Sequence, residues 1–488
     1  MSDLHKAPRR RRRRPRGAAP LCALAGLLSA CAVGPDYERP QAPTLTRYTP
    51  EKTASPGRGQ HFREGEDVPE RWWEAFGSRR LDELVEEGLA RSPTLEAADA
   101  AIRVAQFNAF AATGQFFPQV TLNSNSLYSE SSGETTATQT FSQTPYGFFT
   151  KQVQISYTLD VWGANWRTIE SLDAQRESQV YQKEAARLTL AANLVRAAIE
   201  EASLRGQIAA THQVIALQEQ GLTLLQQQLS RGVAAGTAVL AQETALGQAR
   251  LLLPNLESRL GQQRDLLTAL AGRYPSDEVE ETFTLAQLSV PRELPVSLPS
   301  RLLEQRPDIR AAEANLHAAS AQIGVAVAAR LPNITLSATG LTSAFSLTQL
   351  FYPGTFGYTL MGNVAQTAFD GMTLYNKQKA VEAAFDQAKA QYRDTGIKAF
   401  QNVADALRAL QNDAKAVSAA RSAEGAAKRY LDRIILQQHV GTVSQLEVVT
   451  AQVSYLEAAN ARVQTEAQRL TDTVALYVAL GGGWGSKD

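Results

Sequence analysis

The chain has 488 residues, and its 49 Lys and Arg residues balance its 49 Asp and Glu residues, giving a formal net charge of zero. The balance is uneven, because residues 1–30 are strongly basic and the rest is net negative. A net-negative mature chain lacks the charge of a general nucleic-acid binder. The two cysteines, Cys22 and Cys31, lie near the N-terminus. Cleavage of residues 1–30 as a leader would leave Cys31 as the one cysteine of the mature chain, which excludes an internal disulfide there.

Residues 1–30 predict an export signal peptide. The basic run Arg9–Arg14 precedes the apolar run Leu21–Leu28, which is too short to span a bilayer as a helix. Leu28-Ser29-Ala30-Cys31 then has the pattern of a bacterial lipobox, which predicts that Cys31 carries lipid, including palmitate. An ordinary signal peptide with a chance cysteine, or a basic nucleic-acid-binding arm, would not need the three features in this order.

The sequence after Cys31 favours the outer membrane. Ala32, rather than Asp, follows the cysteine, and resemblance to bacterial lipoproteins associates this with outer-membrane delivery. No mature segment approaches the apolar length of a membrane-spanning helix, so a mature chain that crosses the membrane must do so as a β-barrel.

Two stretches of the chain recur later at one constant offset. Ser92–Ala100 is similar to Arg306–Ala314, and Phe117–Leu122 is similar to Leu331–Leu336. The length of the repeat favours two fused domain-sized copies over a solenoid. The predicted organisation is a signal peptide (1–30), a lipid anchor and extended tether (31–80), a first repeat (81–272), a connector (273–300), a second repeat (301–481) and a C-terminal tail (482–488).

Each repeat contains a predicted strand pair, at 117–160 and 332–370. Around Val153 and Ile155, apolar residues alternate with polar ones, the pattern of a water-filled transmembrane barrel. A soluble β-sandwich is the alternative, but four strands are few for it and the flanking helices are too long. Asp160 and Asp370 follow the strand pairs and are interpreted as helix caps, since no partners for a catalytic role accompany them.

Each repeat then continues into a predicted antiparallel helical hairpin, at 165–271 and 374–480. Gly232–Gly236 and Gly441 mark the turns. Apolar residues at spacings of three and four predict a seam in each hairpin. The first seam comprises Leu188, Ala192, Val195, Ile199 and Ala202, and the second comprises Val449, Val453, Leu456, Val463, Leu470, Val474 and Tyr477.

The sequence contains no pattern typical of an enzyme or a metal site. The five histidines are scattered without metal-ligand spacing, and neither a phosphate-binding glycine loop nor a nucleophile elbow is present. We therefore predict no catalytic residues, no metal and no cofactor other than the lipid on Cys31.

Four stretches carry a resemblance to a known family. They are Cys31–Tyr37, Leu298-Pro299-Ser300, Gln305–Glu313 with its Arg-Pro-Asp-Ile-Arg sequence, and Gln322–Ala326. With the two-copy plan they resemble the TolC-like outer-membrane efflux proteins, in particular the NodT-type lipoprotein branch. The family fold implies a mixed α and β membrane protein: a homotrimer whose shared β-barrel continues into a long α-helical coiled-coil tunnel. Counting strands agrees, since four per chain fall short of the smallest ordinary barrel of about eight, whereas three chains supply about twelve.

The resemblance implies the passive exit duct of a tripartite efflux pump, moving small molecules from periplasm to exterior. The implied partners are a periplasmic adaptor (membrane fusion protein), an inner-membrane resistance-nodulation-division pump and outer-membrane lipid, with no nucleic acid. A duct for type I protein secretion or for metal efflux is the alternative. A third alternative is a soluble periplasmic coiled-coil adaptor, but the predicted strands and the lipobox argue against it.

The family also implies a closed tunnel end at the helical turns. Many relatives carry a Tyr/Arg-rich stretch there, and this chain has Gln437–Val440 before the glycine and Gln445 after it. The gate is therefore assigned only to the turn regions. The candidate gate residues are Gly236, Thr237, Asp432, Arg433, Gln437, His439 and Gly441.

Overall fold

The computed structural model of the protein describes residues 32–484, apart from 52–53, 58 and 131–144. The predicted signal peptide and Cys31 lie outside the described residues. Among the helices of the described part, none combines the length and the apolar character needed to cross a membrane.

The chain forms two compact units, each assembled from segments distant in sequence. The first unit contains 104–176 and 315–389, together with the N-terminal residues up to Glu38. The second contains 39–103, 177–314 and 390 onward. Each unit therefore combines parts of both predicted repeats, and the packing units cut across the domains expected from sequence.

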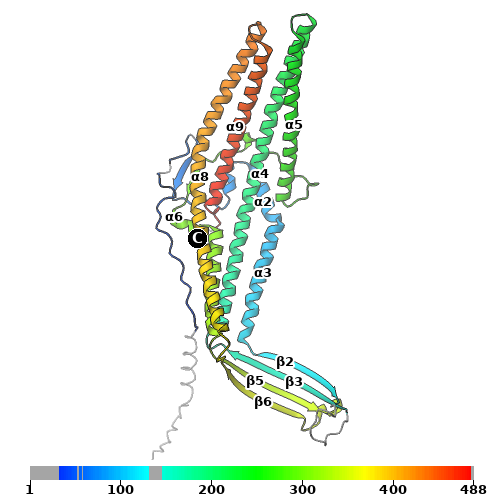
Figure 1. Cartoon of the computed structure of the whole chain (residues 1–488), viewed down its shortest axis with the longest axis vertical. Coiled ribbons are helices and arrows are strands. Elements are labelled where there is room, and N and C mark those ends of the chain that lie inside the picture. Colours follow the sequence, from blue (N-terminus) through cyan, green and yellow to red (C-terminus); the bar gives the residue numbers. More distant parts are fainter. Residues whose placement is uncertain (1–31, 52–53, 58, 131–144, 485–488) are drawn as a thin grey trace, which may run out of the picture. The chain divides into compact units, whose positions relative to one another are not determined.

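The first unit holds one four-stranded antiparallel sheet of order β2-β3-β5-β6 (Figure 1). Its strands are β2 (Gln119–Ser129), β3 (Tyr146–Leu159), β5 (Asn333–Ala344) and β6 (Phe356–Ala365). The 3-10 turns η2 (Gly114–Phe116) and η4 (Leu347–Phe351) precede β2 and β6. The two strand pairs predicted from alternation thus join through β3 and β5.

The register separates the sheet into an apolar and a polar face. Val153 aligns with Leu122 and Gly340, whereas its neighbour Gln154 aligns with Thr121 and Thr339. Aligned residues in an antiparallel pair share a face, and successive residues alternate. Many large apolar and aromatic side chains of the Val153 face are exposed. They include Val120, Leu122, Val153, Ile155, Leu336, Phe356, Tyr358, Leu360 and Val364.

Two long helical hairpins follow the strand pairs (Figure 1). In each, a helix of 67 residues precedes one of 35 residues. The pairs are α4 (Ala164–Ser230) with α5 (Gly236–Leu270), and α8 (Thr373–His439) with α9 (Gln445–Ala479). The other helices are η1 (Trp72–Phe76), α2 (Arg79–Arg91), α3 (Pro93–Thr113), η3 (Leu285–Gln287), α6 (Pro299–Gln305) and α7 (Pro307–Ala328).

The two aspartates after the strand pairs cap the long helices, as predicted. The Asp160 carboxylate accepts hydrogen bonds from the backbone N–H groups of Asn165 and Trp166, at 3.1 and 3.2 Å. Asp370 accepts from Thr373 and Leu374, at 3.1 and 2.8 Å. Each carboxylate satisfies N–H groups that have no partner inside the helix.

An aromatic cluster of the second unit fixes η1 against the end of α9. Trp72 and Phe76 are fully buried, and the Trp72 and Tyr477 ring centroids lie 5.5 Å apart. Burial raises the pKa of Tyr477 to about 12. Trp73 is buried with them, so the cluster holds η1 in place beside α9.

Part of the predicted tether is folded. Strand β1 (His61–Glu64) pairs in parallel with β4 (Glu293–Val296), a segment of the predicted connector. Neither of these strands is predicted from the sequence, because a four-residue strand is too short for its alternation to be recognised.

Candidate functional site

The two helical turns, where the gate is predicted, have well-defined backbone hydrogen bonds. The α4–α5 turn passes through Gly232 at φ 73°, and the N–H of Val233 donates to the carbonyl of Gln228 at 2.9 Å. In the α8–α9 turn, Gly441 has φ 77°, a value that favours glycine. The Ser444 N–H then donates to the Glu447 carboxylate at 2.8 Å, forming a capping box at the start of α9.

The predicted gate residues are mostly exposed in the single chain. Gly236, Thr237, Gln437 and Gly441 are exposed at the turns. His439 ends α8, and its side chain lies outside the described atoms.

Asp432 and Arg433 are also exposed and lie on the last turns of α8. The Asp432 carboxylate pairs with Lys428 at 3.6 Å, one turn earlier on the same helix. The structure therefore gives Asp432 a partner within α8, and contacts of these two residues to other helices remain a prediction.

A network of glutamines joins the two hairpins near their turns. Gln445 at the start of α9 donates from Nε2 to Oε1 of Gln242 on α5 at 2.6 Å. Gln242, fully buried, donates in turn to the carbonyl of Gln218 on α4 at 2.9 Å. Gln438, on α8, donates from its amide to Gln445 Oε1. Three glutamine side chains and the backbone carbonyl of Gln218, from four helices, thus link the two hairpins near their turns.

Sequence reasoning missed this network. Gln242 falls between the buried residues Val239 and Leu246, on the face of α5 that packs inward. A glutamine at a core position signals an internal hydrogen-bond partner, because burial of an unpaired amide is costly.

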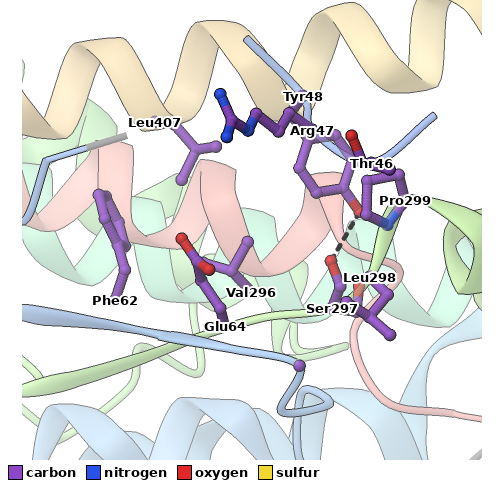
Figure 2. Close-up of a pocket in the computed structure, with 11 residues that line it drawn as sticks. Thr46, Arg47, Tyr48, Phe62, Glu64, Val296, Ser297, Leu298, Pro299 and Leu407 are labelled. Atoms are coloured by element: carbon purple, nitrogen blue, oxygen red, sulfur yellow. Dashed lines mark hydrogen bonds between the residues drawn. The ribbon is translucent and has the colours of Figure 1, made fainter. Parts of the chain in front are cut away.

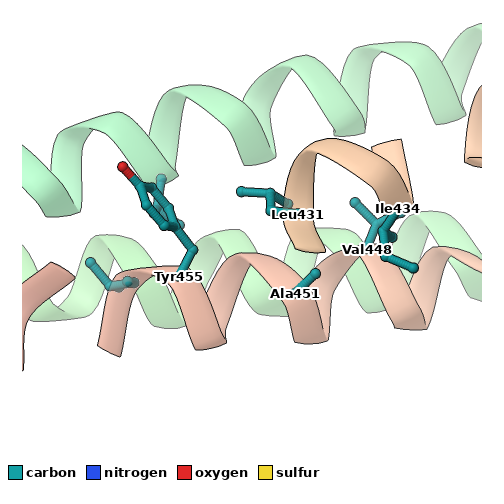
Figure 3. Close-up of a cluster of buried hydrophobic side chains, with 7 residues drawn as sticks. Leu431, Ile434, Val448, Ala451 and Tyr455 are labelled. Atoms are coloured by element: carbon teal, nitrogen blue, oxygen red, sulfur yellow. The ribbon is translucent and has the colours of Figure 1, made fainter. Parts of the chain in front are cut away.

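An apolar cluster lies beneath the α8–α9 turn (Figure 3). Leu431 and Ile434 of α8 lie against Val448, Ala451 and Tyr455 of α9. Val214 of α4 and Leu456 complete the cluster.

The cluster corrects one part of the predicted α9 seam. Val448 and Tyr455 are buried, whereas the predicted seam residue Val453 is 42% exposed and Val449 is partly exposed. Here the buried residues of α9 share one cluster with residues of both α8 and α4. From Leu456 to Tyr477 the predicted seam residues are buried.

The residues directly after Cys31 are held at one end of the sheet. The Val33 N–H donates to the Trp162 carbonyl at 3.0 Å, just beyond the end of β3. The Asp36 carboxylate pairs with the buried Arg167 side chain of α4 at 2.7 Å. A Cβ on Gly34 would lie 2.5 Å from the Gly324 Cα, so the backbone passes α7 at a distance that only glycine permits.

A small cavity of about 160 Å³ lies beside the β1–β4 pair (Figure 2). The Tyr48 hydroxyl donates to the Ser297 carbonyl at 2.9 Å, and burial raises the pKa of Tyr48 to about 12. The walls combine Phe62, Val296 and Leu407 with exposed charged side chains. Within the described residues, no group of three or more His, Cys, Asp or Glu side chains is placed to hold a metal ion.

Comparisons with known proteins cover most of the chain. The family model described as outer membrane efflux protein matches residues 84–273 and 298–482. The pyoverdine export outer membrane protein OpmQ of Pseudomonas putida is 29% identical over 439 residues, which cover 85% of this chain and 88% of that protein. The cation efflux system protein CusC of Escherichia coli is 26% identical over 473 residues, covering 95% and 98%. The crystal structure of the outer membrane protein VceC from Vibrio cholerae aligns with a TM-score of 0.77 and 25% identity, covering 86% of this chain and all (100%) of that one.

Proposed function

Since the chain belongs to the outer membrane efflux protein family and acts as an outer-membrane efflux channel, we propose that three copies form one passive exit duct. Each copy contributes its four strands to a shared twelve-stranded barrel and its two hairpins to a helical tunnel. The observation that carries the proposal is the sheet itself, which has two open edges and one apolar face.

The open edges support closure between chains. Among the described residues of one chain, β2 and β6 each pair on one side only. Unpaired strand edges cannot remain in lipid, where every backbone N–H and C=O group needs a partner. Four strands do not close alone, and joining β2 of one copy to β6 of the next satisfies the edges of all three.

The hairpins support the tunnel. A helix of 67 residues rises about 100 Å at about 1.5 Å per residue. The equal helix lengths in the two halves support the predicted duplication and give six equivalent hairpins in a trimer. Their turns form the closed end that a periplasmic adaptor opens, and an inner-membrane resistance-nodulation-division pump supplies the energy.

The N-terminal contacts support a lipid on Cys31. The residues that follow Cys31 are fixed beside Trp162 and Gly163, where β3 ends and α4 begins. The end of a barrel strand lies at the membrane surface. A lipid attached at Cys31 would therefore enter the same membrane as the strands, without a long linker.

Crosslinking tests the shared barrel. One cysteine replaces Thr121 of β2, and a second is placed on β6, in separate variants at Gly357, Thr359, Met361 or Asn363. At least one of these pairs should form covalent trimers. Both positions lie on edge strands of one chain, at opposite sides of the sheet. Thr339 of the internal strand β5 provides the control, since its cysteine should not link chains. Native mass spectrometry in detergent should give three chains per particle, and a folded monomer with full strand content would refute the proposal.

A further inference from the structure

The polar face of the sheet is lined by uncharged residues. The register places Thr121, Gln154, Thr339 and Thr359 in one row across the four strands. The next rows on this face are Gln119, Ser156, Ser337 and Met361, and Asn123, Gln152, Leu341 and Gly357. In the four described strands, this face carries no Asp, Glu, Lys or Arg.

The single charged residue of these strands belongs to the other face. Lys151 aligns with Ser124 and Thr342, in the register of Val153 and Ile155. Its amine lies 5.5 Å from the centre of the Phe351 ring. Lys151 therefore adds no charge to the polar face.

The two aspartates between the strand pairs and the long helices already accept hydrogen bonds. Asp160 and Asp370 each accept two or more backbone hydrogen bonds as helix caps. The positive ends of α4 and α8 offset these carboxylates.

From this arrangement we propose that the strand section is a neutral, hydrogen-bonding passage suited to uncharged or charge-balanced polar molecules, rather than to cations or anions as a class. The inference rests on the proposed trimeric duct, in which the polar face lines the lumen. Fixed lumen charges act over about 10 Å at 0.1 M salt and set the preference of a pore for one sign of ion. Hydroxyl and amide side chains form hydrogen bonds with polar solutes, but they carry no net charge that would attract cations or anions.

Ion selectivity of the full-length trimer in planar bilayers tests the proposal. Under a potassium chloride gradient, the wild-type potassium-to-chloride permeability ratio should lie within about twofold of unity. Gln154→Glu adds one lumen carboxylate per chain, and it should raise the ratio at least about threefold because no fixed charge balances it. A wild-type preference beyond about threefold for either sign would overturn the proposal.

Thr342→Glu is the matched control, since it adds the same charge to the apolar face. It should leave the ratio at the wild-type value, while native mass spectrometry reports whether the variant still forms trimers. An equal shift from both variants, or none from Gln154→Glu, would overturn the face assignment. Loss of trimers in the wild type would instead refute the proposed duct.

Cargo export provides a second readout in cells. Two fluorescent efflux probes of similar size, one neutral and one cationic, should be compared in a strain whose only copy of the gene is the variant. Gln154→Lys should slow export of the cationic probe severalfold and leave that of the neutral probe unchanged. Equal slowing of both probes would indicate obstruction of the pore rather than charge, and would count against the proposal.

Discussion

Gln445 and Gln242 connect the two helical hairpins directly, through a 2.6 Å hydrogen bond between their side-chain amides. Gln242 is fully buried and donates a second hydrogen bond, to the backbone carbonyl of Gln218 on α4. The two hairpins of one chain are therefore linked near their turns, and a gate at this end would involve both.

Gln242→Leu should loosen this end of the molecule. The substitution leaves the Gln445 amide without its acceptor, at a cost of about 1–3 kcal/mol. Hydrogen exchange of the amides around Gly441 and Gly232 should accelerate by about tenfold, since about 1.4 kcal/mol corresponds to tenfold. Gln437→Leu, at an exposed position of α8, is the control and should leave exchange at the wild-type rate. Unchanged exchange in Gln242→Leu would show that the hydrogen bond does not couple the hairpins.

Replacing Asp432 and Arg433 together by Ala should raise the single-channel conductance of the isolated trimer. We predict that both residues contact neighbouring helices in the closed trimer, where each exposed polar contact contributes about 0.2–1 kcal/mol. Lys428→Ala removes the partner of Asp432 on the same helix, at 3.6 Å, and serves as the control. It should leave conductance unchanged. If only Lys428→Ala opened the channel, the intrahelical pair would be the relevant contact.

Cysteines placed in the two turns, at Thr237 and Thr442, should crosslink and abolish export without disturbing the trimer. A covalent link between hairpins prevents the separation of turns that opening requires. Export is measured as efflux of a fluorescent probe before and after reduction of the disulfide. Recovery on reduction confirms a reversible block, and undiminished export by the crosslinked protein would place the gate elsewhere.

Cys31 should be the acylated N-terminus of the mature protein. Mass spectrometry of the purified protein should detect a lipid-modified N-terminal peptide that begins at this residue. Cys31→Ala should weaken membrane anchoring but still allow barrel insertion, because the strands supply a second membrane attachment. An unmodified N-terminus at another residue would contradict the prediction.

Stability should depend on pH through Asp413. Burial, and then the neighbouring carboxyl of Asp472, raise the pKa of Asp413 from 3.8 to about 7, while Arg469 opposes this rise. Between these values the folded chain keeps a proton that the unfolded chain releases, so the contribution of Asp413 to stability is fully present below about pH 4 and is lost as pH rises through about 7.

Asp413→Asn should flatten this dependence. The thermal unfolding midpoint of the wild type should decline between about pH 5 and pH 7.5, and that of the variant should stay nearly constant. Asp405→Asn, on the exposed side of α8, is the control and should keep the wild-type decline. A variant that follows the wild-type curve would assign the titration to another group.

The sequence by itself determined the local structure of this protein. Glycine positions and apolar spacing predicted the helical hairpins at 165–271 and 374–480, and the observed helices run from Ala164 to Leu270 and from Thr373 to Ala479. The caps at Asp160 and Asp370 were also predicted from the sequence, because the N–H groups at a helix N-terminus need an acceptor that lies within a few residues in the chain. These features depend on residues that are close together in the chain, so the local sequence is sufficient to predict them.

Only the tertiary structure decided which distant residues meet. Gln242 and Gln445 are partners because two separate hairpins come together, and Val448 rather than Val449 packs into a cluster formed with α4 and α8. Likewise, His61–Glu64 becomes a strand only by pairing with Glu293–Val296. Burial and hydrogen bonding at these positions depend on neighbours hundreds of residues away, whose approach no local pattern specifies.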